Sequence, residues 1–506
     1  MWTSPYDPLP EAPPLLLDRV AEHAGRDGAR LALVDAANGI QVTRSELLER
    51  AHRTAGALAA RGFGAGSVLA LWAPNSPDWA VAALGAMAAG GAVTGISPVA
   101  TDGELAMFLA RTRAAVLAAD PVLLARARAA GVGTVAVLPE LAGADGRPAP
   151  DVRIEPTTTA LLPGSSGTTG PPKSVLLTHG NLAAGIAQLQ TGVRFTEGDV
   201  VLAVAPFPHI LGTVVTLAGP LAAGATVVTL PRFDLAGLLA AVEAYRVTVL
   251  AVPPPVLAAL TSPRAADSDL SSVQFIAAGG APVSPALQER AAARLPHAVV
   301  AQGYGMTETT AMIPVPDRDR GTLPGTVGFL GPGTEARVVD PGSGHDLGPD
   351  QDGELWVRGP QVTPGYLDDP AADAALFSPD GWLRTGDLAR FDGAGRLGLV
   401  DRLKELIKVD GLQVPPAELE ALLMAHPAVA DAAVVGRPDE RHGEVPVAAV
   451  VPRGDVDPDQ LIAWAAEQVS PHKRLAGLRL VEQIPRSPAG KILRRLLREE
   501  AVGAAR

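Results

Sequence analysis

The chain has 506 residues, more than one hydrophobic core usually organises, so its length predicts two or more domains. Hydrophobic residues make up 47% and charged residues 19%, a balance that is typical of globular proteins and excludes a largely disordered chain. The net charge of −12 argues against a protein that binds nucleic acid, and the absence of cysteine excludes disulfides, thiolate metal ligands and a catalytic thiol.

Short apolar runs alternate with helical patterns along the first 150 residues. The run from Val68 to Trp72 predicts a strand, and a helix is expected from about Pro77 to Ala89, with proline in its first turn. A second strand follows, and then a helix that opens with the capping box of Thr101 and Glu104. Similar units recur from 199 to 312, and this alternation predicts a layered, mainly parallel sheet.

The segment from Val200 to Pro231 contains no Asp, Glu, Lys or Arg and is long enough to cross a bilayer. Its prolines and glycines divide it into short pieces, which favours a buried strand, loop, helix and strand over a membrane span. The N-terminal sequence MWTSPYDPLPEAPP has neither the basic nor the apolar region of a signal peptide. We therefore expect a soluble, cytoplasmic protein without a membrane span.

The pattern changes twice in the second half of the chain. Short strands with glycine turns are expected from about 325 to 400, and a compact α+β pattern with denser charge follows Arg402. The elements expected in that last part are a helix near Pro416–Met424, strands near Ala432–Val435 and Pro446–Val451, and a helix near Pro458–Val469. A domain boundary is therefore placed at 400 to 404.

The stretch SSGTTGPPK (165–173) has the composition of a phosphate-binding loop. From Gly167, the sequence GTTGPPKS has the lysine and serine of a Walker A loop, but Pro172 stands at the second glycine. Because proline has no N–H, this loop must bind phosphate through hydroxyl side chains and the Lys173 ammonium. A P-loop kinase or NTPase is excluded on this ground, and an ordinary surface turn explains the whole string poorly.

Five further motifs follow the loop in a fixed order. They are AGGAP (278–282), GYGMTET (303–309), WLRTGDLARFD (382–392), VDRLKELIKVDGLQVPPAELE (400–420) and IPRSPAGKILRR (484–495). With the phosphate loop, this ordered set resembles the adenylate-forming superfamily, and most closely the plant-type 4-coumarate–CoA ligases and their bacterial relatives. The resemblance implies an α/β protein. It has a large N-terminal domain (1–402) of layered, mainly parallel sheets with a small β-rich subdomain, and a small mobile α+β C-terminal domain (403–506).

The resemblance also implies an ATP-dependent reaction in two steps. A carboxylate attacks the α-phosphate of ATP to give acyl-AMP and pyrophosphate, and a thiol, usually that of coenzyme A, then displaces AMP. Glu308 would be the Mg²⁺ ligand, and Lys491, His209, Thr168 and Lys173 would be catalytic. The ATP- and AMP-binding residues would be Ser165, Ser166, Gly167, Thr168, Thr169, Gly170, Lys173, Gly279, Gly280, Ala281, Pro282, Gly303, Tyr304, Gly305, Met306, Thr307, Asp387, Arg402 and Lys491.

Two further sets of residues follow from the resemblance. The acyl pocket would be formed by His209, Leu211, Val215, Ala278, Gly303, Gly305, Ala311 and Met312. The hinge and the coenzyme A path would include Lys404, at the pivot, with Lys408, Gly411, Gln413 and Lys473. The main catalytic and binding roles each have a structural alternative. Asp387 and Arg402 could instead form a surface ion pair, and Glu308 could cap a helix. Tyr304 and His209 could be ordinary core residues, and Lys491 could be a solvated lysine near the basic tail.

The apolar pocket residues favour an aryl or medium-chain acid, because no carboxylate is available to pair with an α-ammonium group. Leu211 stands where phenylpropanoid ligases typically have tyrosine, which favours cinnamate- or benzoate-like acids over 4-coumarate. Asp410 stands where related ligases often have a basic residue, and its charge keeps open an amide synthetase with an amine acceptor. A non-catalytic nucleotide- or acyl-binding protein is the alternative from another class. A monomer or homodimer is expected.

Overall fold

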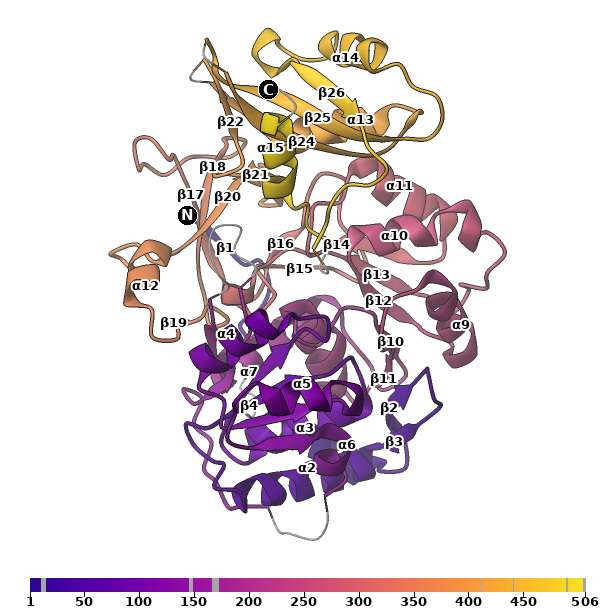
Figure 1. Cartoon of the computed structure of the whole chain (residues 1–506), viewed down its shortest axis with the longest axis vertical. Helices are drawn as coiled ribbons and strands as arrows, with labels where there is room; N and C mark the ends of the chain where they lie inside the picture. The colour runs from indigo at the N-terminus through magenta and orange to yellow at the C-terminus, as the bar shows by residue number, and fades with distance from the viewer. Residues whose placement is uncertain are drawn as a thin grey trace.

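The computed structural model describes residues 1–10, 15–144, 149–165, 173–410, 412–439, 441–487 and 490–503. Two seven-stranded sheets form the larger part of the molecule, a five-stranded sheet flanks them, and another five-stranded sheet belongs to the C-terminal part. Figure 1 shows the N-terminal layers in indigo and magenta at the bottom and the C-terminal sheet and its helices in yellow at the top.

One seven-stranded sheet contains the strands predicted near the N-terminus. Its central strands are parallel, whereas β9 pairs antiparallel with β8 and with β19. In spatial order its strands are β19 (Gly365–Tyr366), β9 (Val175–Thr178), β8 (Thr159–Leu161), β5 (Ala92–Ile96), β4 (Val68–Trp72), β6 (Val116–Ala119) and β7 (Val135–Val137). All five residues of β4 are buried, as expected for a strand that is covered on both faces.

The second seven-stranded sheet is parallel except for its edge strand β3. Its strands are β14 (Val299–Gln302), β13 (Phe275–Ala278), β12 (Val249–Val252), β10 (Val200–Ala203), β11 (Thr226–Thr229), β2 (Leu31–Asp35) and β3 (Gln41–Thr43). A hydrophobic core that includes residues of both seven-stranded sheets joins them. The predicted layered, mainly parallel architecture is confirmed.

Helices cover these sheets, and several of them carry the terminal signals seen in the sequence. The capping box of Thr101 and Glu104 is present at the start of α4 (Asp102–Thr112), and α3 (Pro77–Ala88) ends one residue before the predicted limit. The other helices of this part are α1 (Leu16–Arg26), α2 (Arg44–Ala59), α5 (Leu124–Ala129), α6 (Leu138–Ala142), α7 (His179–Gly192), α8 (Gly219–Ala222), α9 (Leu235–Tyr245), α10 (Pro254–Leu260) and α11 (Pro285–Arg294).

The uncharged segment from Val200 to Pro231 forms the predicted strand, loop, helix and strand, as β10, a loop, a helix and β11. Its helix differs from the expectation, because residues Leu211–Ala218 form a π-helix that continues into α8. The Thr213 hydroxyl donates to the Phe207 carbonyl ahead of the helix, and the Thr216 hydroxyl donates to the Gly212 carbonyl in its first turn. In the described part of the chain, no helix is both long and apolar enough to span a membrane.

The five-stranded sheet of the N-terminal part consists of β1 (Trp2–Thr3), β17 (Glu335–Val339), β18 (Gly353–Arg358), β20 (Leu383–Phe391) and β21 (Leu397–Arg402). Strand β16 (Phe329–Leu330) and helix α12 (Pro370–Leu376) also lie within residues 325–400, and β16 pairs with β15 (Pro314–Val315), which precedes this region. This arrangement confirms the short strands with glycine turns that the sequence predicts for 325–400.

The C-terminal part is a separate α+β unit with its own hydrophobic core. Its strands are β23 (Leu412–Val414), β22 (Ile407–Val409), β25 (Gly443–Pro452) and β24 (Val429–Asp439), with β26 (Gly477–Leu480) paired to β25, and its helices are α13 (Pro416–Ala425), α14 (Pro458–Ala466) and α15 (Arg494–Gly503). The predicted strands near 432–435 and 446–451 are longer than expected because β24 and β25 pair over a long antiparallel ladder. Helix α14 ends three residues before the predicted limit.

Candidate active site

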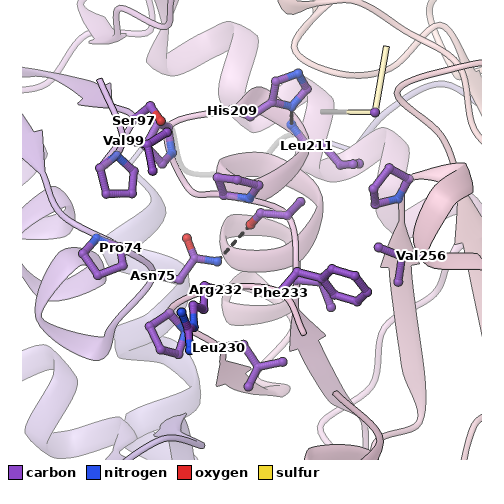
Figure 2. A pocket seen from close by; sticks show the side chains of 18 of the residues that line it. Pro74, Asn75, Ser97, Val99, His209, Leu211, Leu230, Arg232, Phe233 and Val256 are labelled. Atoms are coloured by element: carbon purple, nitrogen blue, oxygen red, sulfur yellow. Dashed lines mark hydrogen bonds between the residues drawn. The ribbon is translucent and has the colours of Figure 1, made fainter. Parts of the chain in front are cut away.

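A cavity of about 380 Å³ lies at the carboxyl ends of strands from both seven-stranded sheets. The segments that line it follow β4 and β5 in one sheet and β10, β11 and β12 in the other, and Arg486, Ser487 and Gly490 of the C-terminal part line it as well. Parallel α/β sheets commonly bind ligands at this edge. Figure 2 shows the side chains that face the cavity, with His209 and Leu211 at its upper rim.

Asn75 holds the loop that leads to His209. Its buried amide donates to the Ala203 and Ala205 carbonyls at 3.1 and 2.9 Å, and its Oδ1 accepts the Phe207 N–H at 2.7 Å. A Cβ on Gly212 would lie 2.1 Å from the Pro206 carbonyl oxygen, so only glycine permits the close return of the chain after this loop. The loop after β10 in one seven-stranded sheet is therefore held in place by Asn75, which follows β4 in the other.

His209 is a neutral imidazole in this environment. Burial, and after it the charge of Lys491, lowers its pKa to about 4. Its Nδ1 lies 3.2 Å from the Leu211 N–H and accepts a hydrogen bond from it. The proton therefore resides on Nε2, and His209 offers a hydrogen-bond donor instead of a base.

Asp387 and Arg402 lie side by side on β20 and β21, where they are partners in the antiparallel register. Arg402 Nε lies 2.9 Å from Asp387 Oδ1, and the Tyr304 hydroxyl donates to Asp387 Oδ2. The carboxylate raises the pKa of Arg402, while burial, followed by the negative charge of Asp387, raises the pKa of Tyr304 well above its usual value. The alternative for these two residues was a surface ion pair. They do form an ion pair, but Asp387 is buried, and the pair is joined to Tyr304 from the loop after β14.

Glu308 is a buried carboxylate in the short helical turn Thr307–Thr309. Its Oε1 accepts a hydrogen bond from the Tyr366 hydroxyl at 2.7 Å, and Lys173 Nζ lies 4.9 Å from the centre of the Tyr366 ring. Burial, and then the charge of Glu308, raises the pKa of Tyr366, so the hydroxyl keeps its proton. A single oriented hard-oxygen ligand suits a Mg²⁺ ion that takes its other ligands from phosphates and water.

Lys491 reaches the same place from the C-terminal part. Its N–H donates to Ser487 Oγ at 3.2 Å, and its carbonyl accepts the Ser487 N–H at 2.8 Å. Burial, and after it the positive charge of Arg402, lowers the pKa of Lys491 to about 8, while Asp387 and Glu308 act in the opposite direction. The tail lysine is thus partly buried and lies within reach of the charges of Arg402, Asp387 and Glu308.

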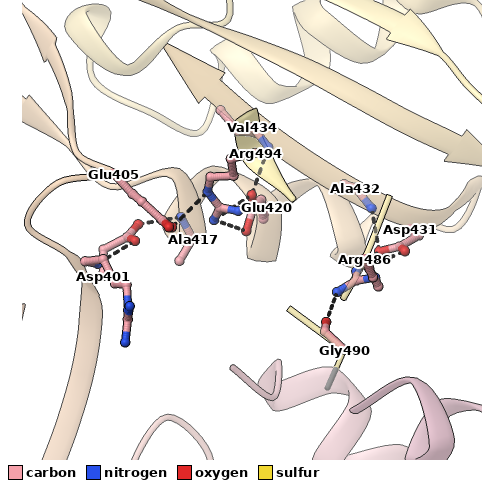
Figure 3. A network of polar contacts seen from close by, with 11 residues as sticks. Asp401, Glu405, Ala417, Glu420, Asp431, Ala432, Val434, Arg486, Gly490 and Arg494 are labelled. Carbon is pink, nitrogen blue, oxygen red and sulfur yellow. Dashed lines mark hydrogen bonds and ion pairs between the residues drawn. The ribbon is translucent and has the colours of Figure 1, made fainter. Parts of the chain in front are cut away.

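The turn that carries Lys491 is tied to the C-terminal sheet by Arg486. Its Nη2 lies 2.8 Å from Asp431 Oδ1, and its Nη1 donates to the Gly490 carbonyl at 3.0 Å, as Figure 3 shows. Gly490 has φ of +82° and packs against Pro253 and Pro255 of the N-terminal part. Arg486, Ser487 and Gly490 therefore form part of the cavity wall.

The base of the phosphate loop is closed like a hairpin. The Ser165 N–H donates to the Lys173 carbonyl at 2.7 Å, and the Lys173 N–H donates to Ser165 Oγ at 3.2 Å. Because Lys173 also lies over Tyr366, this base is next to Glu308. The remaining predicted loop residues lie outside the described residues: Ser166, Gly167, Thr168, Thr169 and Gly170.

The predicted adenine segments meet where strands β13 and β14 end. Gly303 N–H donates to the Ala278 carbonyl at 2.8 Å, and a Cβ on Gly279 would lie 2.9 Å from the Gly303 carbonyl oxygen. This brings together the two groups of predicted residues, which are Gly279, Gly280, Ala281 and Pro282 in one, and Gly303, Tyr304, Gly305, Met306 and Thr307 in the other.

The predicted acyl residues separate into two groups. His209 and Leu211 line the cavity. The other predicted acyl residues do not line the cavity in the described part of the chain: Val215, Ala278, Gly303, Gly305, Ala311 and Met312. Four of them are buried, and Gly305 packs on the Ala311 carbonyl.

The predicted hinge residues lie at the junction with the C-terminal part. Lys404 is exposed, and burial of its charged end followed by Arg402 lowers its pKa. Lys408 and Gln413 are register partners on β22 and β23, Lys473 Nζ lies 2.7 Å from the Glu418 carboxylate, and Gly411 lies outside the described residues. The His442 imidazole lies 2.9 Å from Asp410 Oδ2, so the unusual acid has a basic partner within the chain.

Tyr366 and Asn75 are site residues that the sequence analysis does not identify. Tyr366 follows glycine in TPGYL, and Asn75 follows the first strand of its unit in APNSP. A polar residue directly after a buried parallel strand is a signal that could have pointed to Asn75. For Tyr366 the only signal is the glycine-turn context.

Two family models match the chain. One, described as AMP-binding enzyme, matches residues 20–367, and one described as AMP-binding enzyme C-terminal domain matches residues 418–491. The chain belongs to the AMP-binding enzyme family. It is an adenylate-forming enzyme of the acyl-CoA synthetase type, and the two-domain α/β fold expected from the resemblance is confirmed.

Three relatives illustrate the range of this family. The chain is 39% identical to 4-coumarate–CoA ligase 5 of Oryza sativa subsp. japonica, over 96% of this chain and 94% of the relative. The structure of ATP-bound MatB from Rhodopseudomonas palustris has a TM-score of 0.91 and 30% identity, over 98% of this chain and 100% of that one. The amide bond synthetase McbA from Marinactinospora thermotolerans has a TM-score of 0.85 and 30% identity, over 96% and 99%.

Proposed function

We propose that the enzyme activates an aryl or medium-chain carboxylic acid as its acyl-AMP and transfers the acyl group to coenzyme A. The observation that carries this proposal is a cluster of four charged side chains that lie close enough for their charges to shift the pKa values of Arg402 and Lys491. Three come from the N-terminal part and one from the C-terminal part: Asp387, Arg402, Glu308 and Lys491. We assign residues 1–402 to the adenylating domain and 403–506 to the mobile domain. The cytoplasmic location and the state of a monomer or homodimer stay predictions.

In the first step the carboxylate oxygen of the acid bonds to the α-phosphorus of ATP, and the bond from that phosphorus to the bridging oxygen of pyrophosphate breaks. An anion attacks a polyanion in this step, so fixed positive charge is the main requirement. Lys491 and Lys173 supply it, and Arg402 with Asp387 holds the ribose. A Mg²⁺ ion held by Glu308 would neutralise phosphate charge and orient the phosphates.

In the second step the thiol sulfur loses its proton to solvent and bonds to the acyl carbonyl carbon, and the bond from that carbon to the AMP oxygen breaks. The 380 Å³ cavity, with Arg232 and Arg486 in its lining, fits the approach of a polyanionic thiol. His209 donates from Nε2 toward the acyl oxygen. Since Ser487 and Gly490 line the same cavity, the C-terminal domain must turn away to open the path completely.

The acid is expected to lack a para hydroxyl group. Leu211 offers no hydrogen bond at the cavity rim, and the lining residues are mainly apolar. A buried hydroxyl without a partner is costly, which disfavours hydroxylated cinnamates relative to cinnamate or benzoate.

The amide synthetase is the second candidate function. McbA is named an amide bond synthetase and is similar to this chain over nearly its whole length, and Asp410 places a negative charge near the predicted thiol path. Asp410 already has a hydrogen-bonding partner in His442 within the chain, so we keep coenzyme A as the preferred acceptor.

A substrate panel tests the proposal. The purified chain with Mg²⁺ and ATP is offered cinnamate, benzoate, octanoate, 4-coumarate and an amino acid, and pyrophosphate release is measured before acceptors are compared. We expect cinnamate, benzoate or octanoate to be used best and coenzyme A to exceed simple amines. Clear preference for 4-coumarate would overturn the acid assignment, and faster turnover with amines would overturn the acceptor.

A further inference from the structure

Helix α13 lacks a cap from its own sequence. Its N-cap position is Pro415, whose side chain makes no capping hydrogen bond, and Pro416 begins the helix. By contrast, α14 in the same domain is capped by its own N-cap residue Asp457, which accepts the Asp459 N–H. The first turn of α13 therefore needs an acceptor from elsewhere.

Asp401 supplies that acceptor from the other domain. Its Oδ2 accepts the Ala417 N–H, in the first turn of α13, at 2.8 Å, and its Oδ1 accepts the Arg402 N–H at 2.7 Å (Figure 3). Asp401 lies on β21, where it is the register partner of Leu388 in the five-stranded sheet of the N-terminal part. One hydrogen bond thus joins the last strand of one domain to the first helix of the next.

The neighbouring polar contacts lie on the other side of the predicted pivot. Arg494 ion-pairs with Glu420 at 3.0 Å and with Glu405 at 3.1 Å, and Glu420 accepts the Val434 N–H. All four residues follow Lys404, so these contacts move with the C-terminal domain. When that domain turns about Lys404, the bond from Asp401 to α13 is the contact of this network that must break.

The contact is also of a kind that can open and close. Burial raises the pKa of Asp401, which means that its carboxylate loses hydration in this arrangement. On release, the carboxylate and the Ala417 N–H both regain water, so the separation costs less than the loss of a hydrogen bond inside a core.

We propose that Asp401 is a positioning residue that holds the C-terminal domain, and with it Lys491, in the adenylate-forming arrangement. It does so by capping α13 across the domain boundary. This inference rests on the proposed two-step function and adds the residue that selects between its two arrangements.

The two half-reactions separate this role from a merely structural one. Asp401→Ala is expected to slow ATP–pyrophosphate exchange with cinnamate by about fivefold to tenfold, the usual size of a lost cap, and to leave thioester formation from supplied cinnamoyl-AMP and coenzyme A unchanged or faster. The matched control Asp457→Ala removes a cap within the C-terminal domain and is expected to leave the ratio of the two rates as in the wild type. Equal slowing of both half-reactions by Asp401→Ala would overturn the inference.

A second variant keeps the test sharp if the first is unstable. Pro415→Ser added to Asp401→Ala gives α13 a local cap, with Glu418 three residues on as in a capping box. Thermal stability is expected to recover while pyrophosphate exchange stays slow. Recovery of exchange would show that α13 needs only a cap and would overturn the positioning role.

An acid-independent measurement distinguishes failure of the inference from failure of the proposed function. The chain has no cysteine, so Glu289→Cys on α11 and Glu467→Cys beside α14 accept a dye pair across the two domains. Energy transfer in the resting protein is expected to shift on Asp401→Ala and not on Asp457→Ala. No shift would overturn the inference, whereas a wild type that activates no acid would overturn only the function.

Discussion

Deprotonation of Lys491 should limit acyl-AMP formation at alkaline pH. Burial and the charge of Arg402 lower the pKa of this ammonium from 10.5 to about 8. Since the charged form is needed to meet the phosphate and the carboxylate, the rate falls as pH rises through this value. At pH 9, one unit higher, about one molecule in ten retains the ammonium, so kcat/KM for ATP is expected to fall about tenfold from its plateau.

The assay is ATP–pyrophosphate exchange between pH 6.5 and 10, because it reports the first step without the ionisation of the thiol acceptor. The phosphates of bound ATP raise the pKa of the lysine, so the alkaline limb of kcat is expected at higher pH than that of kcat/KM. Lys491→Arg keeps its charge throughout this range and is expected to be slower but flat in kcat/KM between pH 7 and 9.5.

Lys404 is the matched control, because burial and Arg402 lower its pKa as well. Lys404→Met is expected to retain an alkaline limb, moved to somewhat higher pH because the charge of Lys404 contributes to the lowered pKa of Lys491. The reasoning is refuted if Lys491→Arg shows the same limb as the wild type, or if Lys404→Met abolishes it.

Three further outcomes are expected. Tyr366→Phe removes the hydroxyl that orients Glu308, so KM for Mg-ATP should rise about tenfold in initial-rate assays, and an unchanged KM would remove Tyr366 from the site. Asn75→Ala leaves three buried backbone groups without partners, so the free energy of unfolding should fall by about 3 kcal/mol in urea titrations. A fall of less than about 1 kcal/mol would show that water replaces the amide and would contradict this role of Asn75. Lys491→Met removes a charge whose pKa is lowered on folding from 10.5 to about 8, so it should stabilise the protein at pH 7 by about 3 kcal/mol. The gain is expected to disappear between pH 8 and 10.5, and equal stability at pH 7 would contradict the desolvation of the ammonium.

Local sequence signals predict much of the fold. The capping box at Thr101, the proline at the start of α3 and the prolines of the segment from Val200 to Pro231 each report on neighbours within a few residues, so their elements appear where the sequence places them. The limits of β24 and β25 were too short because pairing between the two strands, and not the composition of either, decides where each ends.

The site was predictable only where its residues lie in linear motifs. Asp387, Arg402, Glu308 and Lys491 belong to such motifs, whereas the contact of Tyr366 with Glu308 depends on where the two-residue strand β19 joins its sheet. The cap that Asp401 provides to α13 needs the relative placement of two domains. Neither propensity nor periodicity reports on such placement.

The shared wall of the cavity has a consequence for the order of events. Ser487 and Gly490 line the cavity that we propose for the acceptor, and Ser487 is hydrogen-bonded to Lys491, the residue that we propose for the phosphates. We therefore expect that coenzyme A cannot bind fully while the C-terminal domain holds Lys491 in the site. Pyrophosphate should then leave before coenzyme A binds. Double-reciprocal plots of ATP against coenzyme A should accordingly be parallel, which is the signature of a ping-pong sequence.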